Sequence, residues 1–348
     1  MQFIIGNKKI GEDSPVFIIA ELSANHNNDF RLTEKTLIAM KNAGADAVKV
    51  QTYLPEDMTL DLDTPMFQTR KDTIWKGRKL FDLYKEASMP YTWYIKLNQI
   101  AKNLGMEFFS SPFSKQAVDM LEDLNVPAYK IASPEITDFP LIEYIAVKDK
   151  PVILSSGIAT RSDLEDAVDI IRMVGNDKIA ILKCTTAYPA PYSEINLRTI
   201  PDIGDFFNVI PGLSDHTLGT AIPVASVVLG AKIIEKHFIL NRKQGGPDAV
   251  FSLEPMEFKL MVESIRNVEK ALGNVNYNLT ESTKKSRLVA RSLFAVKDIK
   301  QGEVLTEFNI RSIRPGYGLH PKYLTKILGK KAKTNFLTGT PLSWSLIE

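Results

Sequence analysis

The feature that most constrains the fold of this chain is a series of short apolar runs rich in β-branched residues, most of them followed by a segment with helical spacing. We expect strands at Val16–Ala20, Ala47–Gln51, Glu107–Ser110, Ala128–Ile131, Val152–Ser155, Ile179–Cys184, Val209–Leu213 and Lys232–Lys236. Buried runs that alternate with helices are typical of parallel sheets. Eight runs in about 240 residues match a (β/α)8 barrel, whose usual length is ~250 residues. An open doubly wound sheet is the alternative, but no Gly-x-Gly-x-x-Gly turn follows the first run, so the barrel is favoured.

Helical spacing between the runs supports the same architecture. The clearest expected helices each end just before a glycine, which adopts the left-handed conformation at little cost; they are Thr33–Ala43, Tyr91–Leu104 and Ser162–Met173. After a last helical segment, Glu257–Leu272, the pattern changes. We therefore expect a barrel domain over 1–273, a polar linker over 274–289 and a small β-rich domain over 290–348. A domain of that size buries little surface alone, so we expect it to dock on a barrel.

Composition excludes several classes of protein. The formal net charge is +2, from 43 basic and 41 acidic residues, which argues against the broad basic field of a nucleic-acid-binding protein. Cys184 is the only cysteine, so no intramolecular disulfide forms, and its apolar surroundings predict a core position. No signal peptide and no run of ~20 apolar residues is evident. We expect a cytoplasmic protein that binds neither nucleic acid nor membrane.

Polar and charged residues gather at the carboxyl ends of the expected strands, where the active sites of such barrels lie. They are Glu21 with Asn25 and His26; Lys49 and Gln51; Ser110 and Ser111; Lys130, Ser133 and Glu135; Ser155 and Ser156; Thr185 and Thr186; Ser214, Asp215 and His216; and Glu235, Lys236 and His237. Any one of these could form a structural salt bridge, but unpaired buried charges are costly, and so many together predict a charged ligand. Lys49 and Lys130, with nearby hydroxyls, suit a phosphate and a carboxylate on one small molecule.

Two histidines and a glutamate are the candidates for chemistry. His216 and His237 follow neighbouring strands, so their imidazoles could hold one divalent metal that polarises a carbonyl. Each could instead be a hydrogen-bonded structural residue. Glu21 is the leading candidate for a general acid or base, with pairing to a lysine as its structural alternative.

Seven segments in conserved order together resemble the sialic acid synthase family, over nearly the whole chain. They are AELSANH at 20–26, KVQ at 49–51, FSSPF at 109–113, YKIAS at 129–133, GLSDH at 212–216, EKHF at 235–238 and RPG at 314–316. The form of the first segment, the stretch from Trp75 to Trp93 and Gly318–Lys322 are more similar to the branch of the family that makes pseudaminic acid than to the neuraminate branch.

The resemblance implies a fold, partners and roles for individual residues. It implies a (β/α)8 barrel followed by an antifreeze-like (SAF, β-clip) domain, in a domain-swapped homodimer. It also implies a divalent metal, usually Mn²⁺ with Mg²⁺ or Co²⁺ also tolerated, held by His216 and His237. Glu21 would assist the attacking water. The residues implied to bind phosphoenolpyruvate are Lys49, Ser110, Lys130, Ser133, Ser155 and Ser214, and those implied to face the sugar are Gln51, Glu135, Tyr188, Asp248 and Arg314, the last reaching the neighbouring subunit's site.

The activity expected from the resemblance is a condensation of phosphoenolpyruvate with an N-acetylated amino-sugar aldehyde and water, giving a nine-carbon nonulosonic acid and phosphate. For the favoured branch the acceptor is 2,4-diacetamido-2,4,6-trideoxy-L-altrose and the product pseudaminic acid; legionaminic and neuraminic acid synthases share the mechanism. Thr186 stands where neuraminate synthases carry Asn, which weakens a neuraminate assignment. A Schiff-base aldolase using Lys49, Lys130, Lys183 or Lys236 is less favoured, and a non-catalytic carbohydrate-binding protein least favoured.

Overall fold

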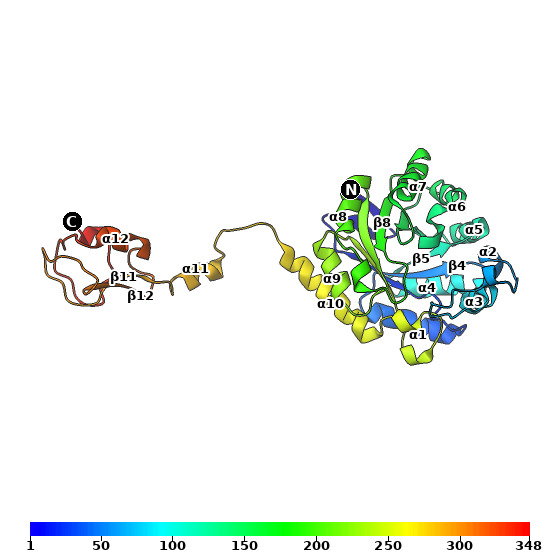
Figure 1. Ribbon diagram of the computed structural model, residues 1–348, viewed down its shortest axis with the longest axis horizontal. Coiled ribbons are helices and arrows are strands. Elements are labelled where there is room, and N and C mark those ends of the chain that lie inside the picture. The colour runs from blue at the N-terminus through cyan, green and yellow to red at the C-terminus, as the bar shows by residue number, and fades with distance from the viewer. The chain divides into compact units, whose positions relative to one another are not determined.

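The structure is a computed structural model that describes residues 1–348. The chain forms two compact units, Met1–Gly273 and Asn274–Glu348. Figure 1 shows the first unit, in blue to yellow, as strands surrounded by helices. None of the helices is both long enough and apolar enough to cross a membrane.

The first unit is built on a closed barrel of eight parallel strands, in which neighbours along the chain pair and β10 closes on β3. The strands are β3 (Phe17–Glu21), β4 (Ala47–Thr52), β5 (Glu107–Pro112), β6 (Tyr129–Ile131), β7 (Val152–Ser155), β8 (Ile179–Cys184), β9 (Ile210–Asp215) and β10 (Ile233–His237). All eight lie within two residues of the expected runs. The prediction of a (β/α)8 barrel is confirmed, and the open doubly wound sheet was the wrong alternative.

Helices cover the outside of the barrel (Figure 1). They are α1 (Phe30–Asn42), α2 (Pro55–Met58), α3 (Leu80–Ala87), α4 (Tyr94–Asn103), α5 (Lys115–Asp123), α6 (Phe139–Ala146), α7 (Arg161–Met173), α8 (Thr199–Phe207), α9 (Ala221–Val228) and α10 (Pro255–Leu272). Local sequence explains several boundaries. Asp29 caps α1 by accepting hydrogen bonds from the Arg31 and Leu32 amides, and Thr160 caps α7 through the Asp163 amide. The glycine after α7, Gly175, has a φ of 85°.

Two features of the first unit were not expected from the sequence. A short antiparallel hairpin, β1 (Gln2–Ile5) and β2 (Lys8–Gly11), precedes the barrel. The connection between β4 and α4 is long and contains α2 and α3. It is tied to the loop after β3, because His26 Nε2 lies 3.0 Å from the Ala87 carbonyl oxygen and Asn28 Nδ2 donates to the Glu86 carbonyl at 3.2 Å. These contacts place the connection beside the strand ends.

The second unit has its own small core. It contains α11 (Glu281–Arg287), β11 (Ser292–Ala295), β12 (Ile310–Ile313) and α12 (Leu324–Ile327), with β11 and β12 antiparallel. The core residues are Leu293, Ala295, Ile299, Leu305, Ile310, Ile327, Ala332, Phe336, Leu342 and Ile347. The unit contains a small antiparallel sheet, whereas the stretch expected to be a polar linker contains α11, capped by Thr280. Arg314 follows β12 in this unit.

Candidate active site

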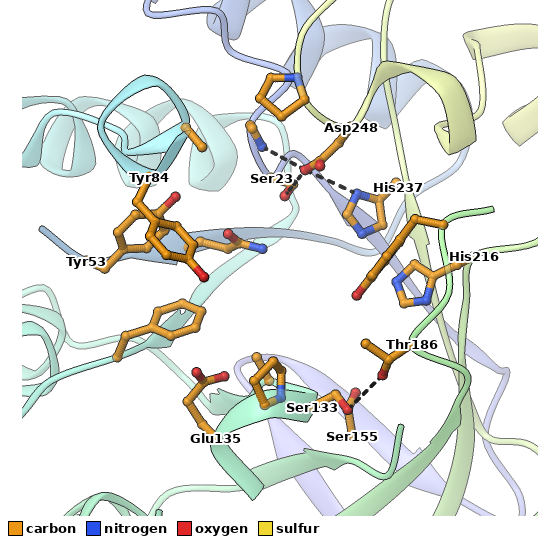
Figure 2. Close-up of a pocket in the computed structure, with 18 of the residues that line it drawn as sticks. Ser23, Tyr53, Tyr84, Ser133, Glu135, Ser155, Thr186, His216, His237 and Asp248 are labelled. Carbon is orange, nitrogen blue, oxygen red and sulfur yellow. Dashed lines mark hydrogen bonds and ion pairs between the residues drawn. The ribbon is translucent and has the colours of Figure 1, made fainter. Parts of the chain in front are cut away.

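The carboxyl ends of the barrel strands surround a cavity of about 360 Å³. Figure 2 shows Tyr53, Tyr84 and Glu135 on one side of this space and Thr186, His216 and His237 on the other. Most of the residues predicted from the sequence line it: Lys49, Gln51, Lys130, Ser133, Glu135, Ser155, Tyr188, Ser214, His216, His237 and Asp248. We call it the central cavity.

Lys49 lies between two buried carboxylates. Its Nζ is 2.5 Å from Glu21 Oε2 and 3.5 Å from Glu235 Oε1. Burial raises the pKa of Glu21, an effect that the ammonium of Lys49 opposes and the charge of Glu235 reinforces. Burial alone would lower the pKa of Lys49, but the two carboxylates outweigh it and raise that pKa. Because Glu21 is buried and shares one ammonium with a second carboxyl group, its pKa is raised to about 7, so Glu21 can gain or lose a proton near neutral pH.

Lys130 is a buried cation without a carboxylate partner. Its side chain forms no salt bridge, although the residue is only 1% exposed. Its Nζ donates hydrogen bonds to Ser155 Oγ at 2.5 Å and to the Ile131 carbonyl at 2.9 Å. Burial lowers the pKa of Lys130, which the more distant Glu235 partly opposes. A buried ammonium held in this way has its positive charge available to an anion in the cavity.

A glycine shapes the wall beside Lys130. Ser133 Oγ lies 3.0 Å from Thr186 Oγ1 and accepts a hydrogen bond from the Ile158 amide at 2.9 Å. A Cβ added to Gly157 would lie 2.0 Å from Thr186 Oγ1 and 2.4 Å from Ser133 Oγ. Only glycine lets the loop after β7 approach these two hydroxyls so closely.

His216 and His237 form a pair at the ends of β9 and β10. Their ring centroids are 5.2 Å apart. His216 Nδ1 lies 3.1 Å from the Thr185 carbonyl oxygen and so donates to it, which leaves Nε2 as the free acceptor. His237 Nδ1 is buried without a hydrogen-bond partner, 4.0 Å from Asp248 Oδ2. Burial lowers the pKa of His216 to about 4 and lowers that of His237 well below its usual value, so both rings are neutral.

The histidine pair fits a metal that keeps open positions. No group of three or more His, Cys, Asp or Glu side chains is arranged to hold a metal ion by itself. The pair nevertheless has the properties of ligands: both imidazoles are neutral, His216 is oriented by a backbone carbonyl, and His237 has an unsatisfied ring nitrogen. A metal here would take its remaining ligands from water or substrate.

Asp248 and Tyr188 cover the histidine side of the central cavity. Asp248 accepts hydrogen bonds from Ser23 Oγ at 2.5 Å and from the Ala24 amide at 3.3 Å. Tyr188 packs edge-on against His216, with ring centroids 4.6 Å apart. Both residues were expected to face the sugar, and both lie beside the histidine pair.

The opposite side of the central cavity is aromatic and carries one acid. Tyr53 and Phe113 pack with ring centroids 5.3 Å apart, and Tyr53 and Tyr84 with 6.0 Å. Glu135 faces this group, and its Oε2 is buried without a hydrogen-bond partner. Burial raises the pKa of Glu135 to about 7. This side therefore suits a ligand group that has apolar surface and at least one N–H or O–H donor.

Three predicted residues do not line the central cavity. Glu21 lies beneath Lys49 and reaches the cavity only through it. Ser110 faces away from the barrel axis, where its hydroxyl lies 2.6 Å from Thr52 Oγ1 and donates to the Val50 carbonyl. The expectation that Ser110 binds phosphoenolpyruvate disagrees with this orientation. Arg314 belongs to the second unit.

The neighbouring serine, Ser111, lies on the same side of the strand as Lys49, although it does not itself line the central cavity. The register pairs Lys49 with Phe109, Val50 with Ser110 and Gln51 with Ser111. Because side chains alternate along a strand, Ser111 faces the same way as Lys49, and Lys49 Nζ donates to Ser111 Oγ at 3.4 Å.

Lysines considered for a Schiff base differ in their surroundings. Lys236 is fully buried and paired with Asp215. Lys183 lies outside the lining of the central cavity. Lys49 is paired with Glu21, so Lys130 is the one candidate that lines the cavity without a counter-charge.

Comparison with known proteins decides the family. Residues 37–277 match the model of the NeuB family, and residues 290–348 match the SAF domain. The chain belongs to the NeuB family. It is 48% identical to the pseudaminic acid synthase of Helicobacter pylori over 335 residues, which cover 96% of this chain and 98% of that protein. It is 45% identical to the pseudaminic acid synthase of Campylobacter jejuni over 341 residues, 98% of each.

A solved structure supports the same family assignment. The N-acetylneuraminic acid (sialic acid) synthetase of Leptospira borgpetersenii superposes with a TM-score of 0.73 at 31% identity, over 82% of this chain and 95% of that one. The family predicted from the sequence motifs is therefore confirmed, together with the barrel and the C-terminal SAF domain.

The NeuB-family cavity also contains residues that sequence reasoning missed. Tyr53, Trp75, Leu83, Tyr84 and Phe113 line it, four of them from the connection between β4 and α4. Aromatic and apolar residues in a long connection look like ordinary packing along the chain, and only the folded structure shows that they line the cavity: Tyr53 and Tyr84 lie opposite the histidines, whereas Trp75 packs against Tyr188 on the histidine side. Cys184 was expected to be core; it is buried but lines the cavity, with Sγ 3.8 Å from His216 Nδ1.

Proposed function

We propose that this chain condenses phosphoenolpyruvate with an N-acetylated amino-sugar aldehyde and water to give a nonulosonic acid and phosphate, with 2,4-diacetamido-2,4,6-trideoxy-L-altrose as acceptor and pseudaminic acid as product. Membership of the NeuB family and the names of the relatives at 45% and 48% identity support this reaction. The single observation that carries the proposal is that Lys130 is a buried ammonium without a carboxylate partner. It lines the same cavity as a neutral histidine pair.

Phosphoenolpyruvate would occupy the lysine side of the central cavity. Lys130 and Lys49 supply positive charge, and the hydroxyls of Ser111, Ser155 and Ser214 supply hydrogen bonds. Ser133 and Thr186 complete the wall nearby. This arrangement stabilises the negative charge of the phosphate as it departs.

The reaction forms a carbon–carbon bond and a carbon–oxygen bond to water, and it breaks the carbon–oxygen bond to phosphate; the two protons of the water go to the aldehyde oxygen and to the departing phosphate. C3 of phosphoenolpyruvate bonds to the aldehyde carbon of the acceptor, whose oxygen becomes a hydroxyl. Water then adds at C2, losing a proton, and the tetrahedral intermediate loses phosphate. Glu21, whose pKa is raised by burial beside Lys49, takes part in moving the proton of that water. A divalent metal bound by His216 and His237, Mn²⁺ by family resemblance, would supply Lewis-acid polarisation of the aldehyde.

The aromatic side of the central cavity supports a deoxygenated, N-acetylated acceptor. Tyr53, Tyr84 and Phe113 offer apolar surface to methyl groups. Glu135 offers an unpartnered carboxylate oxygen to an amide N–H. Gln51 and Asp248 remain as polar contacts for the rest of the sugar.

The test is release of inorganic phosphate from phosphoenolpyruvate in the presence of Mn²⁺ and single aldehydes. The panel contains the L-altro diacetamido sugar, its legionaminic counterpart and N-acetylmannosamine. We expect the largest kcat/KM with the L-altro sugar. Phosphoenolpyruvate labelled with ¹⁸O at the bridging oxygen should deliver the label to phosphate. No phosphate release with any aldehyde would overturn the proposal, and label retained in the sugar would overturn the bond assigned to cleavage.

We further propose that the enzyme works in the cytoplasm as a homodimer in which Arg314 completes the site of the partner subunit. Mixing a Glu21→Ala protein with an Arg314→Ala protein and allowing subunits to exchange tests this. One intact site per mixed dimer should restore part of the activity. Activity that stays at the sum of the two variants would contradict the shared site.

A further inference from the structure

A second cavity lies outside the barrel, between α7 and α8. Its volume is about 830 Å³, and none of its lining residues lines the central cavity. It is bounded by the loop after β7, by β8 and by the first turns of the two helices. We call it the α7–α8 cleft.

Lys183 is the innermost cation of the α7–α8 cleft. Cys184 lines the central cavity, so its neighbour Lys183 faces the opposite way, into the layer between strands and helices. Its Nζ donates to the Cys184 carbonyl at 2.7 Å and lies 3.5 Å from Thr185 Oγ1. No carboxylate lies within the 4.0 Å of an ion pair. Burial lowers the pKa of Lys183, which shows that the charged form lacks compensation.

Two arginines add to the positive charge. Arg198 lines the α7–α8 cleft and forms no ion pair and no side-chain hydrogen bond within the chain. Arg161 has its nearest carboxylate, that of Glu165, at 3.8 Å, and its guanidinium lies over the Phe206 ring. Asp202 is the only acid among the lining residues. The cleft is therefore a cavity whose lining carries an excess of positive charge, with three cations and one acid.

The backbone favours the same kind of ligand. The first turns of α7 and α8 line the cleft, so the positive ends of two helix dipoles lie beside it, and these attract anions. At the start of α8 the Thr199 and Ile200 amides already donate to the Asn196 and Leu197 carbonyls, and Pro201 has no N–H, so a ligand in the cleft would be bound by side chains.

From the unpaired lysine, the two arginines and the cavity that they share, we infer that the α7–α8 cleft binds a small molecule through a phosphate group. A doubly charged phosphate matches the excess of positive over negative side chains in the lining. The cavity is larger than a phosphate ion and leaves room for the rest of a metabolite. The loop of Ser156 and Gly157 separates this site from the central cavity, where phosphate is a proposed product.

The test must separate the two cavities. Crystals of the full chain are soaked in selenate, a phosphate-shaped dianion that is located by its anomalous signal. We expect one peak beside Lys130 and a second beside Lys183 and Arg198. In crystals of Lys183→Met/Arg198→Met only the peak in the cleft should disappear. A wild-type cleft without a peak, or a peak that survives the double substitution, overturns the inference.

Titration with inorganic phosphate shows whether the site exists in solution. It is done in a Lys130→Met background, so that the central cavity contributes little. We expect Lys183→Met/Arg198→Met to raise the Kd at least tenfold, Lys183→Arg to preserve it, and the matched control Lys178→Met, which removes an exposed partner of Asp149, to leave it unchanged. A selenate peak without measurable phosphate binding would mark an adventitious ion only and overturn the inference.

Discussion

Lys49 and Glu21 form a buried ion pair of 2.5 Å at the floor of the central cavity, and Glu235 contacts the same ammonium at 3.5 Å. One ammonium and two carboxyl groups are thus buried in contact with one another. Burial raises the pKa of Glu21 to about 7, and the two carboxylates keep Lys49 charged, which is the arrangement that the proposed addition of water would use.

Replacing Glu21 with Gln keeps the shape of the side chain and removes its proton exchange. We expect kcat for phosphate release to fall about 10²–10⁴-fold, the range for loss of a general acid or base, with a much smaller change in KM for phosphoenolpyruvate. Steady-state phosphate release at saturating acceptor measures both constants. A variant with near-normal kcat would show that Glu21 is only a partner for Lys49.

Ser111 and Ser110 provide a matched pair of substitutions on one strand. Ser111→Ala should raise KM for phosphoenolpyruvate about 10- to 100-fold, since a hydrogen bond to a charged group contributes about 1.5–3 kcal/mol. Ser110→Ala should leave KM unchanged and instead lower stability by about 1 kcal/mol, because its hydroxyl bonds Thr52 and the Val50 carbonyl. A rise in KM for Ser110→Ala, with no change for Ser111→Ala, would mean that Ser110 rather than Ser111 contacts phosphoenolpyruvate.

Removal of metal should abolish turnover if the histidine pair binds a divalent ion. We expect EDTA to stop phosphate release and Mn²⁺ to restore it. His216→Asn and His237→Asn should also lose Mn²⁺ binding, which the electron paramagnetic resonance signal of free Mn²⁺ reports without any reaction. His320→Asn, in the second unit, is the control and should bind Mn²⁺ normally. Full activity after exhaustive chelation would remove the metal from the mechanism.

Glu135 should make stability depend on pH. Its pKa rises from 4.5 to about 7 on folding, so the protonated form stabilises the folded chain below pH 4.5, and this contribution is lost as the pH rises through 7. At pH 8, Glu135→Gln should therefore exceed the wild type by about 2–3 kcal/mol in unfolding free energy, and at pH 4 the two should be equal.

Urea denaturation of the barrel at the two pH values checks the Glu135 prediction. Glu263→Gln, which removes an exposed carboxylate on α10, should show no such difference. A gain for Glu135→Gln that is the same at both pH values would show that packing rather than ionisation is responsible.

Gly157→Ala should disturb the central cavity while the barrel stays folded. The added Cβ would meet Thr186 Oγ1 at 2.0 Å and Ser133 Oγ at 2.4 Å, so both hydroxyls must rotate away. We expect kcat/KM to fall at least about tenfold, with a stability loss of about 1–3 kcal/mol from overpacking. Gly204→Ala, whose Cβ would lie 3.2 Å from Pro211 Cγ, is the milder control. Kinetics and thermal melting together distinguish the two effects.

The barrel and most of the central cavity were predictable because they depend on local pattern. Each barrel strand is a short buried run, and the charged residues that follow it must meet at one end of a closed barrel. The strand pattern alone therefore places Lys49, Lys130, Ser155, His216 and His237 at one end of the barrel. The aromatic wall was not predictable, because Tyr53 and Tyr84 look like ordinary core residues along the chain.

The amino-acid sequence by itself determined the order of strands and helices, the family and the kinds of charge at the strand ends. The strand register in the folded barrel determines which of two adjacent serines contacts Lys49, since side chains alternate along a strand and a shift of one residue exchanges them. Only the tertiary structure decided that Lys130 has no carboxylate partner while Lys49 has two. Pairing of buried charges depends on which strands are neighbours, a property that distant segments acquire only when the barrel closes.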